Sequence, residues 1–345
     1  MKLKIHSKFK IRNSKFTPRR LSYSLAINEA LHQMMAKDKR VFLLGQGVKS
    51  PWYVGNTATG LIERFTETRV IDTPVSENAT TGAAIGAAIA GMRPVVVHPR
   101  LDFMMYAMDP IINEAANWHY MSGGAASVPL VIWGIINRGG EQAAQHSQAL
   151  QALFAHIPGL KVVMPATPYD AKGLMIAAIR DNNPVVFIDD RALYREEMPV
   201  PKGIYAVPIG KGAIRRHGKD ITVAGISSMA REAVKAAALL AKEGISAEVI
   251  DMRSIKPLDV PLVAKSVKKT GRLLVAEAAW LSGSVSGELT ARIAGDREAW
   301  KALKAPITRV TLPDVPAPMS RTLEKAFYID ATHIVATAKA LIAKR

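Results

Sequence analysis

Short, continuous apolar runs alternate along the chain with longer segments in which apolar residues recur at helical spacing. In the first half the apolar runs predict buried strands at 40–45, 94–98, 128–136, 160–164 and 184–188. The amphipathic segments between them predict helices at 22–37, 61–65, 104–121, 147–156 and 168–180. This alternation is typical of an α/β protein with a mostly parallel sheet that is covered by helices on both faces.

The pattern changes at residues 69–92, where a short strand, a turn and a small-residue helix follow one another. Thr73-Pro74 ends the strand at 69–72, because proline fixes φ and disfavours helix in the residue before it. Ser76 is the predicted N-cap of a helix over 79–90. Glu77 therefore lies at the helix N-terminus, where the macrodipole favours a negative charge. A carboxylate in a first helical turn is either a solvated cap or a functional group, and the spacing alone leaves both open.

The second half repeats the alternation after a segment rich in proline and glycine at 195–212, which we interpret as a domain linker. Strands are predicted at 221–225, 247–251, 272–276 and 308–311, and helices at 230–243, near 258–268, near 284–295 and at 320–343. The chain is thus predicted to have a basic N-terminal arm (1–20), a first α/β domain (21–200) and a second, smaller α/β domain (201–345).

Composition and charge exclude several classes of function. The chain has 345 residues, a net charge of +17 and no cysteine, which excludes disulfides and thiolate metal sites and fits a reducing cytoplasm. The basic residues are spread along the chain and accompany no zinc-finger, helix-turn-helix or RNA-binding motif, so we expect no nucleic-acid partner. No apolar run reaches the ~18–20 residues that span a bilayer, so we expect no membrane segment.

Several motifs in fixed order resemble one family. These are Asp72-Thr-Pro-Val-Ser-Glu77 with the small-residue helix and Gly91-Met-Arg-Pro94, then Tyr120-Met-Ser-Gly-Gly124, Ala144-Gln-His-Ser-Gln148, Pro158-Gly-Leu-Lys-Val-Val163 and Ile179-Arg-Asp-Asn-Asn-Pro184. In the second half, Glu248-Val-Ile-Asp-Met-Arg-Ser-Ile-Lys-Pro-Leu-Asp259 and Val275-Ala-Glu-Ala278 continue the match. The sequence resembles the β subunits of the thiamine-diphosphate-dependent 2-oxo acid dehydrogenases, over about 320 residues. The resemblance implies a pyrimidine-binding parallel-sheet domain followed by a transketolase C-terminal-like domain.

The resemblance gives Glu77 a catalytic role. In the family, the glutamate at this position contacts the aminopyrimidine ring of thiamine diphosphate, whose own amino group acts as the base in its imino form. A carboxyl group that is hydrogen-bonded to the opposite ring nitrogen favours that tautomer, and a carboxyl in an apolar cleft has a raised pKa and can share a proton.

Two more residues gain candidate roles from the same resemblance. Phe103 matches the aromatic residue that packs on the pyrimidine, although its apolar neighbours Met104 and Met105 also fit an ordinary core phenylalanine. His146 matches an active-site histidine that handles substrate protons or positions the lipoyl arm, and it is expected to open a helix after the Gly-rich loop 137–140. The alternative for His146 is a structural histidine.

A structural potassium ion is also implied, as in some family members. Its ligands, largely backbone oxygens, fall on Leu130, Ala178, Asp181 and Asn183. The alternative is a plain helix-ending turn at Asp-Asn-Asn-Pro.

One stretch departs from the family. Residues 98–102, His-Pro-Arg-Leu-Asp, stand where relatives have an acid and large apolar groups. His98 and Arg100 are therefore candidate substrate-binding residues, because Arg100 is suited to a carboxylate or phosphate, and equally to an acid on a partner chain. This departure puts pyruvate and the branched-chain 2-oxo acids in question as substrates.

The Gly-Asp-Gly…Asn motif that binds magnesium and the diphosphate does not occur, so the chain holds half of a cofactor site. The resemblance implies that an α subunit supplies the other half, with magnesium, in an α₂β₂ heterotetramer that has a β–β contact and serves a lipoyl acyltransferase. The predicted reaction is decarboxylation of a 2-oxo acid and transfer of the acyl unit to lipoamide. The alternatives are transfer to an aldehyde or ketone acceptor, and a non-catalytic scaffold, which the presence of Glu77 and His146 disfavours.

Overall fold

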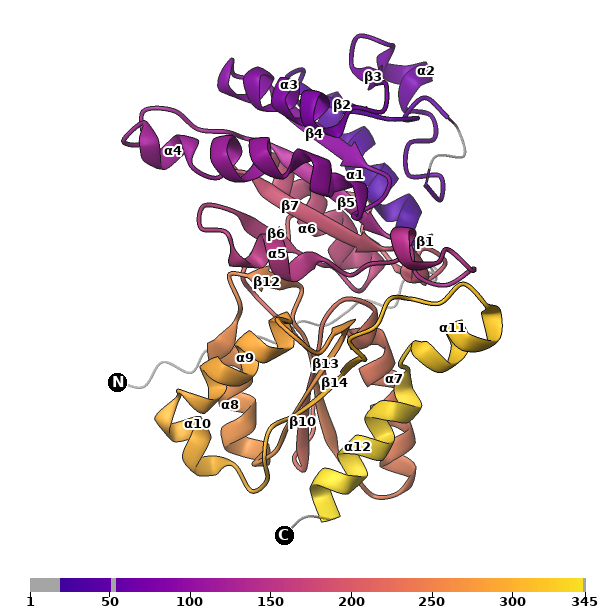
Figure 1. Ribbon diagram of the computed structural model, residues 1–345, viewed down its shortest axis with the longest axis vertical. Helices are drawn as coiled ribbons and strands as arrows, with labels where there is room; N and C mark the ends of the chain where they lie inside the picture. Colours follow the sequence, from indigo (N-terminus) through magenta and orange to yellow (C-terminus); the bar gives the residue numbers. More distant parts are fainter. Residues whose placement is uncertain (1–18, 51–53, 344–345) are drawn as a thin grey trace, which may run out of the picture.

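The computed structural model describes residues 19–50 and 54–343, which form two α/β domains (Figure 1). The predicted N-terminal arm lies almost wholly outside the described residues. The two-domain α/β fold and its mostly parallel sheets are confirmed.

The first domain is built on a seven-stranded sheet. Its strands in spatial order are β12 (Ser254–Lys256), β6 (Lys161–Val163), β7 (Val185–Asp190), β5 (Val131–Ile136), β4 (Arg93–His98), β2 (Val41–Gly45) and β3 (Val70–Asp72). All neighbours are parallel except β12, which runs antiparallel to β6. The central strands β2, β5 and β7 are buried along their whole length, as continuous apolar runs predict.

Helices cover both faces of this sheet. On one face α1 (Tyr23–Lys37) packs against α6 (Pro168–Arg180). On the other face α3 (Glu77–Ile89) packs against β4 and against the helical segment that follows β4 (Figure 1).

The helix predicted at 104–121 is wrong as a single regular helix. The chain instead forms a 3₁₀ turn η1 (Phe103–Ala107), a π-helical segment η2 (Pro110–Ala115) and a short α4 (Trp118–Met121). Pro110 has no amide hydrogen to continue the α-helical ladder, and the wider π-type turn closes with the Ala116 amide donating to the Ile111 carbonyl at 3.0 Å.

The second domain has a five-stranded sheet. Its order is β14 (Thr308–Leu312), β13 (Leu273–Trp280), β10 (Ile221–Gly225), β11 (Ala247–Asp251) and β9 (Ala213–Arg216). The four predicted strands are parallel, and β9 adds an antiparallel edge. The flanking helices are α7 (Ser228–Lys242), α8 (Val260–Thr270), α9 (Val285–Ala294), α10 (Arg297–Ala302) and α12 (Ala331–Ala343).

The last predicted helix, 320–343, is two helices. α11 (Arg321–Phe327) ends at an extended Tyr328, and Asp330 then caps α12 by accepting from the Thr332 amide at 2.8 Å. The stretch Arg321–Ala343 has the length and apolar composition of a candidate membrane span. Its second part, α12, buries Ile334, Ala338 and Leu341 in the core of the second domain, so this apolar face is used inside the fold.

The two domains are joined by shared structure as well as by the chain. β12 follows β11 in the second half and completes the sheet of the first domain. β8 (Glu197–Pro199), within the predicted linker, pairs antiparallel with β1 (Arg20–Ser22). A buried ionic cluster also crosses the boundary, since the Arg215 guanidinium contacts the carboxylates of both Asp170 and Asp251.

Candidate cofactor half-site

Three predicted site residues lie at one edge of the first sheet, where its parallel strands end. Glu77 follows β3, Phe103 follows β4, and His146 lies in the loop after β5. The carboxyl ends of parallel strands are where open α/β sheets place their ligands. The topology therefore brings together residues that are 69 positions apart in the sequence.

Glu77 is the first residue of α3 and is half-buried. Ser76 occupies the N-cap position as predicted, but its side chain makes no capping hydrogen bond. Within the described part of the chain no hydrogen bond or ion pair engages the Glu77 carboxylate. The next residue, Asn78, donates its side-chain amide to the carbonyl of Tyr106 in η1 at 3.5 Å, which ties the start of α3 to the segment of Phe103.

Phe103 and His146 form a ring pair. Their ring centroids are 5.2 Å apart and the planes meet at 83°, an edge-to-face contact. His146 ends a short 3₁₀ turn, Ala144–His146, and α5 begins only at Gln151, so the expectation that His146 opens a helix is wrong. The imidazole is held beside an aromatic ring by a loop and not by a helix start.

Asp102 is a buried carboxylate in this site that was not predicted as a functional residue. Its Oδ1 accepts from the Gln148 amide at 3.2 Å and from the Gln148 side chain at 2.8 Å. Its Oδ2 is buried and has no hydrogen-bond partner among the described residues. Burial raises the pKa of Asp102, while the bonds from Gln148 and the nearby His146 oppose that rise.

His98 and Arg100 are placed differently from each other. The His98 ring is 2% exposed, and its Nε2 lies 3.2 Å from the Thr81 hydroxyl of α3. Burial lowers the pKa of His98 to about 4, so the ring is neutral near pH 7. Its contact with Thr81 links the end of β4 to α3. Arg100 is half-buried in the turn after β4, and its Nη1 donates to the Pro99 carbonyl at 2.8 Å.

The predicted potassium ligands lie at the opposite edge of the sheet. Leu130 precedes β5, and Ala178, Asp181 and Asn183 surround the turn from α6 to β7. This turn already receives cationic groups, because the Arg93 guanidinium donates to the Asp181 carbonyl at 3.0 Å and the Lys161 ammonium lies 2.5 Å from an Asp181 carboxylate oxygen.

A carbonyl oxygen has two lone pairs, so the Asp181 carbonyl can accept from Arg93 and still coordinate a cation. Within residues 19–50 and 54–343, no group of three His, Cys, Asp or Glu side chains is arranged to hold a metal ion.

The open carboxylate of Glu77, the ring pair and the lack of a diphosphate motif in the sequence match what is expected of one class of site. This class is the pyrimidine half of a thiamine-type cofactor site, in an α/β domain that is followed by a second α/β domain. The residues present fit the pyrimidine end of such a cofactor, since an unengaged carboxylate and an aromatic face lie at the same sheet edge.

Comparisons with known proteins agree with this class. The sequence matches the transketolase pyrimidine-binding domain over residues 19–197 and the transketolase C-terminal domain over 210–334. It is 46% identical over 331 residues to the β subunit of acetoin:2,6-dichlorophenolindophenol oxidoreductase from Cupriavidus necator, with 93% of this chain and 97% of that protein covered. It is 42% identical over 326 residues to the pyruvate dehydrogenase E1 component β subunit of Rhizobium meliloti, with 93% and 70% covered.

A solved structure described as a split-gene transketolase, an inactive β4 tetramer, superposes with a TM-score of 0.77 at 22% identity, covering 94% of this chain and 99% of that one. This likeness shows the fold. Taken with the sequence relatives, the chain belongs to the family of the E1 β subunits of the thiamine-diphosphate-dependent 2-oxo acid dehydrogenases, and the predicted family is confirmed.

Proposed function

We propose that this chain, together with an α subunit, decarboxylates a 2-oxo acid on thiamine diphosphate and passes the acyl unit to lipoamide. The observation that carries the proposal is the open carboxylate of Glu77 at the sheet edge that also holds the Phe103–His146 ring pair. A buried structural carboxylate would have its partners within the chain, as Asp170 and Asp251 do.

Each site residue then has a defined task. When bound, thiamine diphosphate supplies an electron sink that accepts the electrons released by loss of carbon dioxide. With the cofactor bound, the Glu77 carboxyl group would share a proton with the pyrimidine. Phe103 would supply an aromatic face for that ring, and a ring nitrogen of His146 would bind or release a proton during the reaction. His98 supports α3, and with it Glu77, through Thr81.

The surface around Glu77 supports a partner that covers it. Two apolar side chains are strongly exposed here: Val75, two residues before Glu77, and Tyr106, whose carbonyl accepts from the Asn78 side chain. An exposed face of α3 also carries Gly82 and Gly86, where an added Cβ would meet no atom within 4 Å. A helix face without side chains lets another backbone approach closely, which suits an α subunit that brings the diphosphate-binding half of the site.

Several finer assignments belong to the same proposal. Magnesium is assigned to the α subunit, because this sequence lacks the diphosphate motif. Potassium is assigned to the carbonyl oxygens near Leu130, Ala178, Asp181 and Asn183, and unfolding temperatures in potassium and in sodium buffers test it. The assembly is an α₂β₂ heterotetramer with a β–β contact, it serves a lipoyl acyltransferase, and the absence of cysteine supports a cytoplasmic location.

A second candidate function is transfer of the acyl carbanion equivalent to an aldehyde or ketone. It is favoured by the stretch His98–Asp102, which differs from the family pattern, and by the charge of the second domain. Residues 206–345 carry 23 Lys or Arg against 13 Asp or Glu, a net +10. Such a surface repels a basic docking domain of an acyltransferase.

The test is co-expression with an α subunit of the same family. The purified complex is supplied with thiamine diphosphate, magnesium and a panel of 2-oxo acids. Decarboxylation that reduces lipoamide supports the proposal. Decarboxylation that proceeds only when an aldehyde or ketone is added supports the second candidate, and no decarboxylation by an intact complex contradicts both.

A further inference from the structure

The segment that carries His146 is held mainly by residues far away in the sequence. We define the His146 segment as residues 141–151. It contains only a 3₁₀ turn at Ala144–His146 and the first residue of α5 (Gln151–His156). So short a turn fixes the chain weakly by itself. The position of the imidazole therefore depends on the side chains that hold this segment.

The second domain holds both ends of the segment. At one end the Glu141 amide donates to the Glu324 carboxylate of α11, at 3.2 and 3.3 Å from its two oxygens. At the other end the Gln151 side chain donates to Glu277 Oε1 of β13 at 2.7 Å. Between them, Gln148 donates to Asp102 of the first domain.

The bond between Gln151 and Glu277 is the most deeply buried of these contacts. Both side chains are almost fully buried, with relative exposures of 1% and 0%. Glu277 is the one acidic residue in the apolar strand β13, and burial raises its pKa. A carboxyl group without water around it costs free energy unless it is hydrogen-bonded.

The two carboxylate oxygens of Glu277 accept hydrogen bonds from different donors. Oε1 accepts from Gln151, and Oε2 accepts from the Ser286 amide in the first turn of α9 at 2.6 Å. Glu277 thus links the His146 segment to a helix of the second domain.

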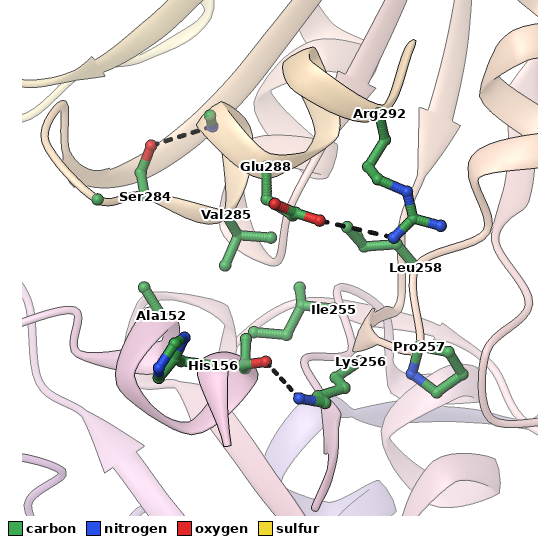
Figure 2. A pocket seen from close by; sticks show the side chains of 13 residues that line it. Ala152, His156, Ile255, Lys256, Pro257, Leu258, Ser284, Val285, Glu288 and Arg292 are labelled. Atoms are coloured by element: carbon green, nitrogen blue, oxygen red, sulfur yellow. Dashed lines mark hydrogen bonds and ion pairs between the residues drawn. The ribbon is translucent and has the colours of Figure 1, made fainter. Parts of the chain in front are cut away.

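The link lies beside a surface pocket. A cavity of about 660 Å³ lies between α5 and α9, and its walls include Ala152 and Val285, which are the neighbours of Gln151 and Ser286 (Figure 2). On the α5 side of this cavity the Lys256 ammonium donates to the Ala155 carbonyl at 2.8 Å (Figure 2). Hydrogen bonds to two residues from the second half of the chain, Glu277 and Lys256, therefore help to fix the position of α5.

We propose that Gln151 and Glu277 are positioning residues for His146, through which the second domain sets the place of the imidazole against Phe103. The kinetic part of this inference rests on the proposed function, whereas its geometric part concerns only this chain. Placement of a reacting group is worth much in rate, because a displacement of about 1 Å can cost about a hundredfold.

The test uses Glu277→Gln, Gln151→Glu and the double variant. In Gln151→Glu two carboxyl groups face each other, and the bond between the two side chains is lost. Glu277→Gln alone keeps both bonds, because its oxygen accepts from Ser286 and its NH₂ donates to the Gln151 oxygen once the Gln151 amide rotates. The double variant restores both bonds, because Gln at 277 accepts from Ser286 and donates to Glu at 151. The swap is therefore a double-mutant cycle on one contact.

Two readouts are made on these variants. In the reconstituted α₂β₂ enzyme, Gln151→Glu should lower kcat by about tenfold to a hundredfold while KM for the 2-oxo acid changes less than about twofold, and Glu277→Gln should stay near wild type. In the isolated full chain with ¹³C-labelled histidine, the ring signal of His146, assigned with His146→Gln, should move in Gln151→Glu because the ring current of Phe103 acts on it. The double variant should recover most of both values.

Glu248→Gln is the matched control. Glu248 is another buried acid of the second sheet and accepts from Ser266 at 2.6 Å, but it has no contact with the His146 segment. This control should lower the unfolding temperature and leave kcat and the His146 signal unchanged. The inference is overturned when Gln151→Glu behaves like this control, or when the double variant recovers neither value. A wild-type complex without activity refutes the proposed function alone, since the His146 signal still decides the geometric part.

Discussion

Substitutions at Gly86 should have different effects on the stability of the isolated chain and on its assembly with the α subunit. Gly86 lies inside α3 on an exposed face, and an added Cβ would meet no atom within 4 Å. Glycine in a helix interior is less favourable than alanine by about 0.8–1 kcal/mol. Gly86→Ala should therefore stabilise the isolated chain by up to about 1 kcal/mol. That is a rise of roughly 2–4 °C in unfolding temperature for a domain of about 150–250 residues.

The same position should respond in the opposite way once the α subunit is present. If a partner backbone packs on this face, a leucine side chain overfills the contact, at a cost of about 1–3 kcal/mol. At 1.4 kcal/mol per tenfold, Gly86→Leu should weaken assembly by about fivefold to 150-fold while the isolated chain stays folded.

The assay combines thermal unfolding of the isolated chain with gel filtration of mixtures with the α subunit over a concentration series. Ala241→Leu, on the exposed surface near the end of α7, is the control for adding a leucine to a helix of this chain, and it should leave assembly unchanged. The reasoning is refuted if Gly86→Leu assembles as tightly as wild type, or if it destabilises the isolated chain.

The remaining predictions concern the site. Glu77→Gln should assemble normally and lose about 10²–10⁴-fold in activity, because the amide cannot share the proton; activity within twofold of wild type in the assembled enzyme contradicts this. The isolated chain should not bind thiamine diphosphate with sub-micromolar affinity in calorimetry with magnesium present, because the diphosphate motif is absent.

His98 has a folded pKa of about 4 against about 6.5 when unfolded, so its stabilisation is present above about pH 6.5 and is lost as the pH falls toward 4. Between pH 8 and pH 5 the free energy of unfolding of wild type should fall by about 2 kcal/mol more than that of His98→Gln, and parallel pH profiles in chemical denaturation would refute it.

The regular parts of the fold could be predicted from the sequence because their determinants are local. The helix predicted over 168–180 is α6 without change, and the predicted strands 221–225 and 247–251 are β10 and β11. The errors fall where a local exception changes the pattern. Pro110 changes the hydrogen-bond ladder after β4, and Asp330 starts a new helix inside an apolar stretch that reads as one helix.

The candidate site was only partly accessible to sequence reasoning. Glu77, Phe103 and His146 came from a family resemblance, and the structure gives them a shared sheet edge and one direct ring contact. Asp102 and Glu277 were missed because the importance of a buried carboxylate depends on long-range partners. One sequence signal was present for Glu277, since a single acid in a continuous apolar strand requires a buried hydrogen-bond partner.

Structural and functional acids of this chain differ in whether their carboxylates have partners within the described part of the chain. Asp170, Asp251 and Glu277 are fully buried, and each is paired with a cation or an amide from a distant part of the chain. These contacts form when the chain folds, so they contribute to the stability of the subunit. Glu77 is half-buried at a helix start, beside exposed apolar side chains, and the described part of the chain gives its carboxylate no partner. We therefore expect groups from outside this chain to complete its environment, and this is the physical reason to expect that cofactor binding and assembly with the α subunit depend on each other.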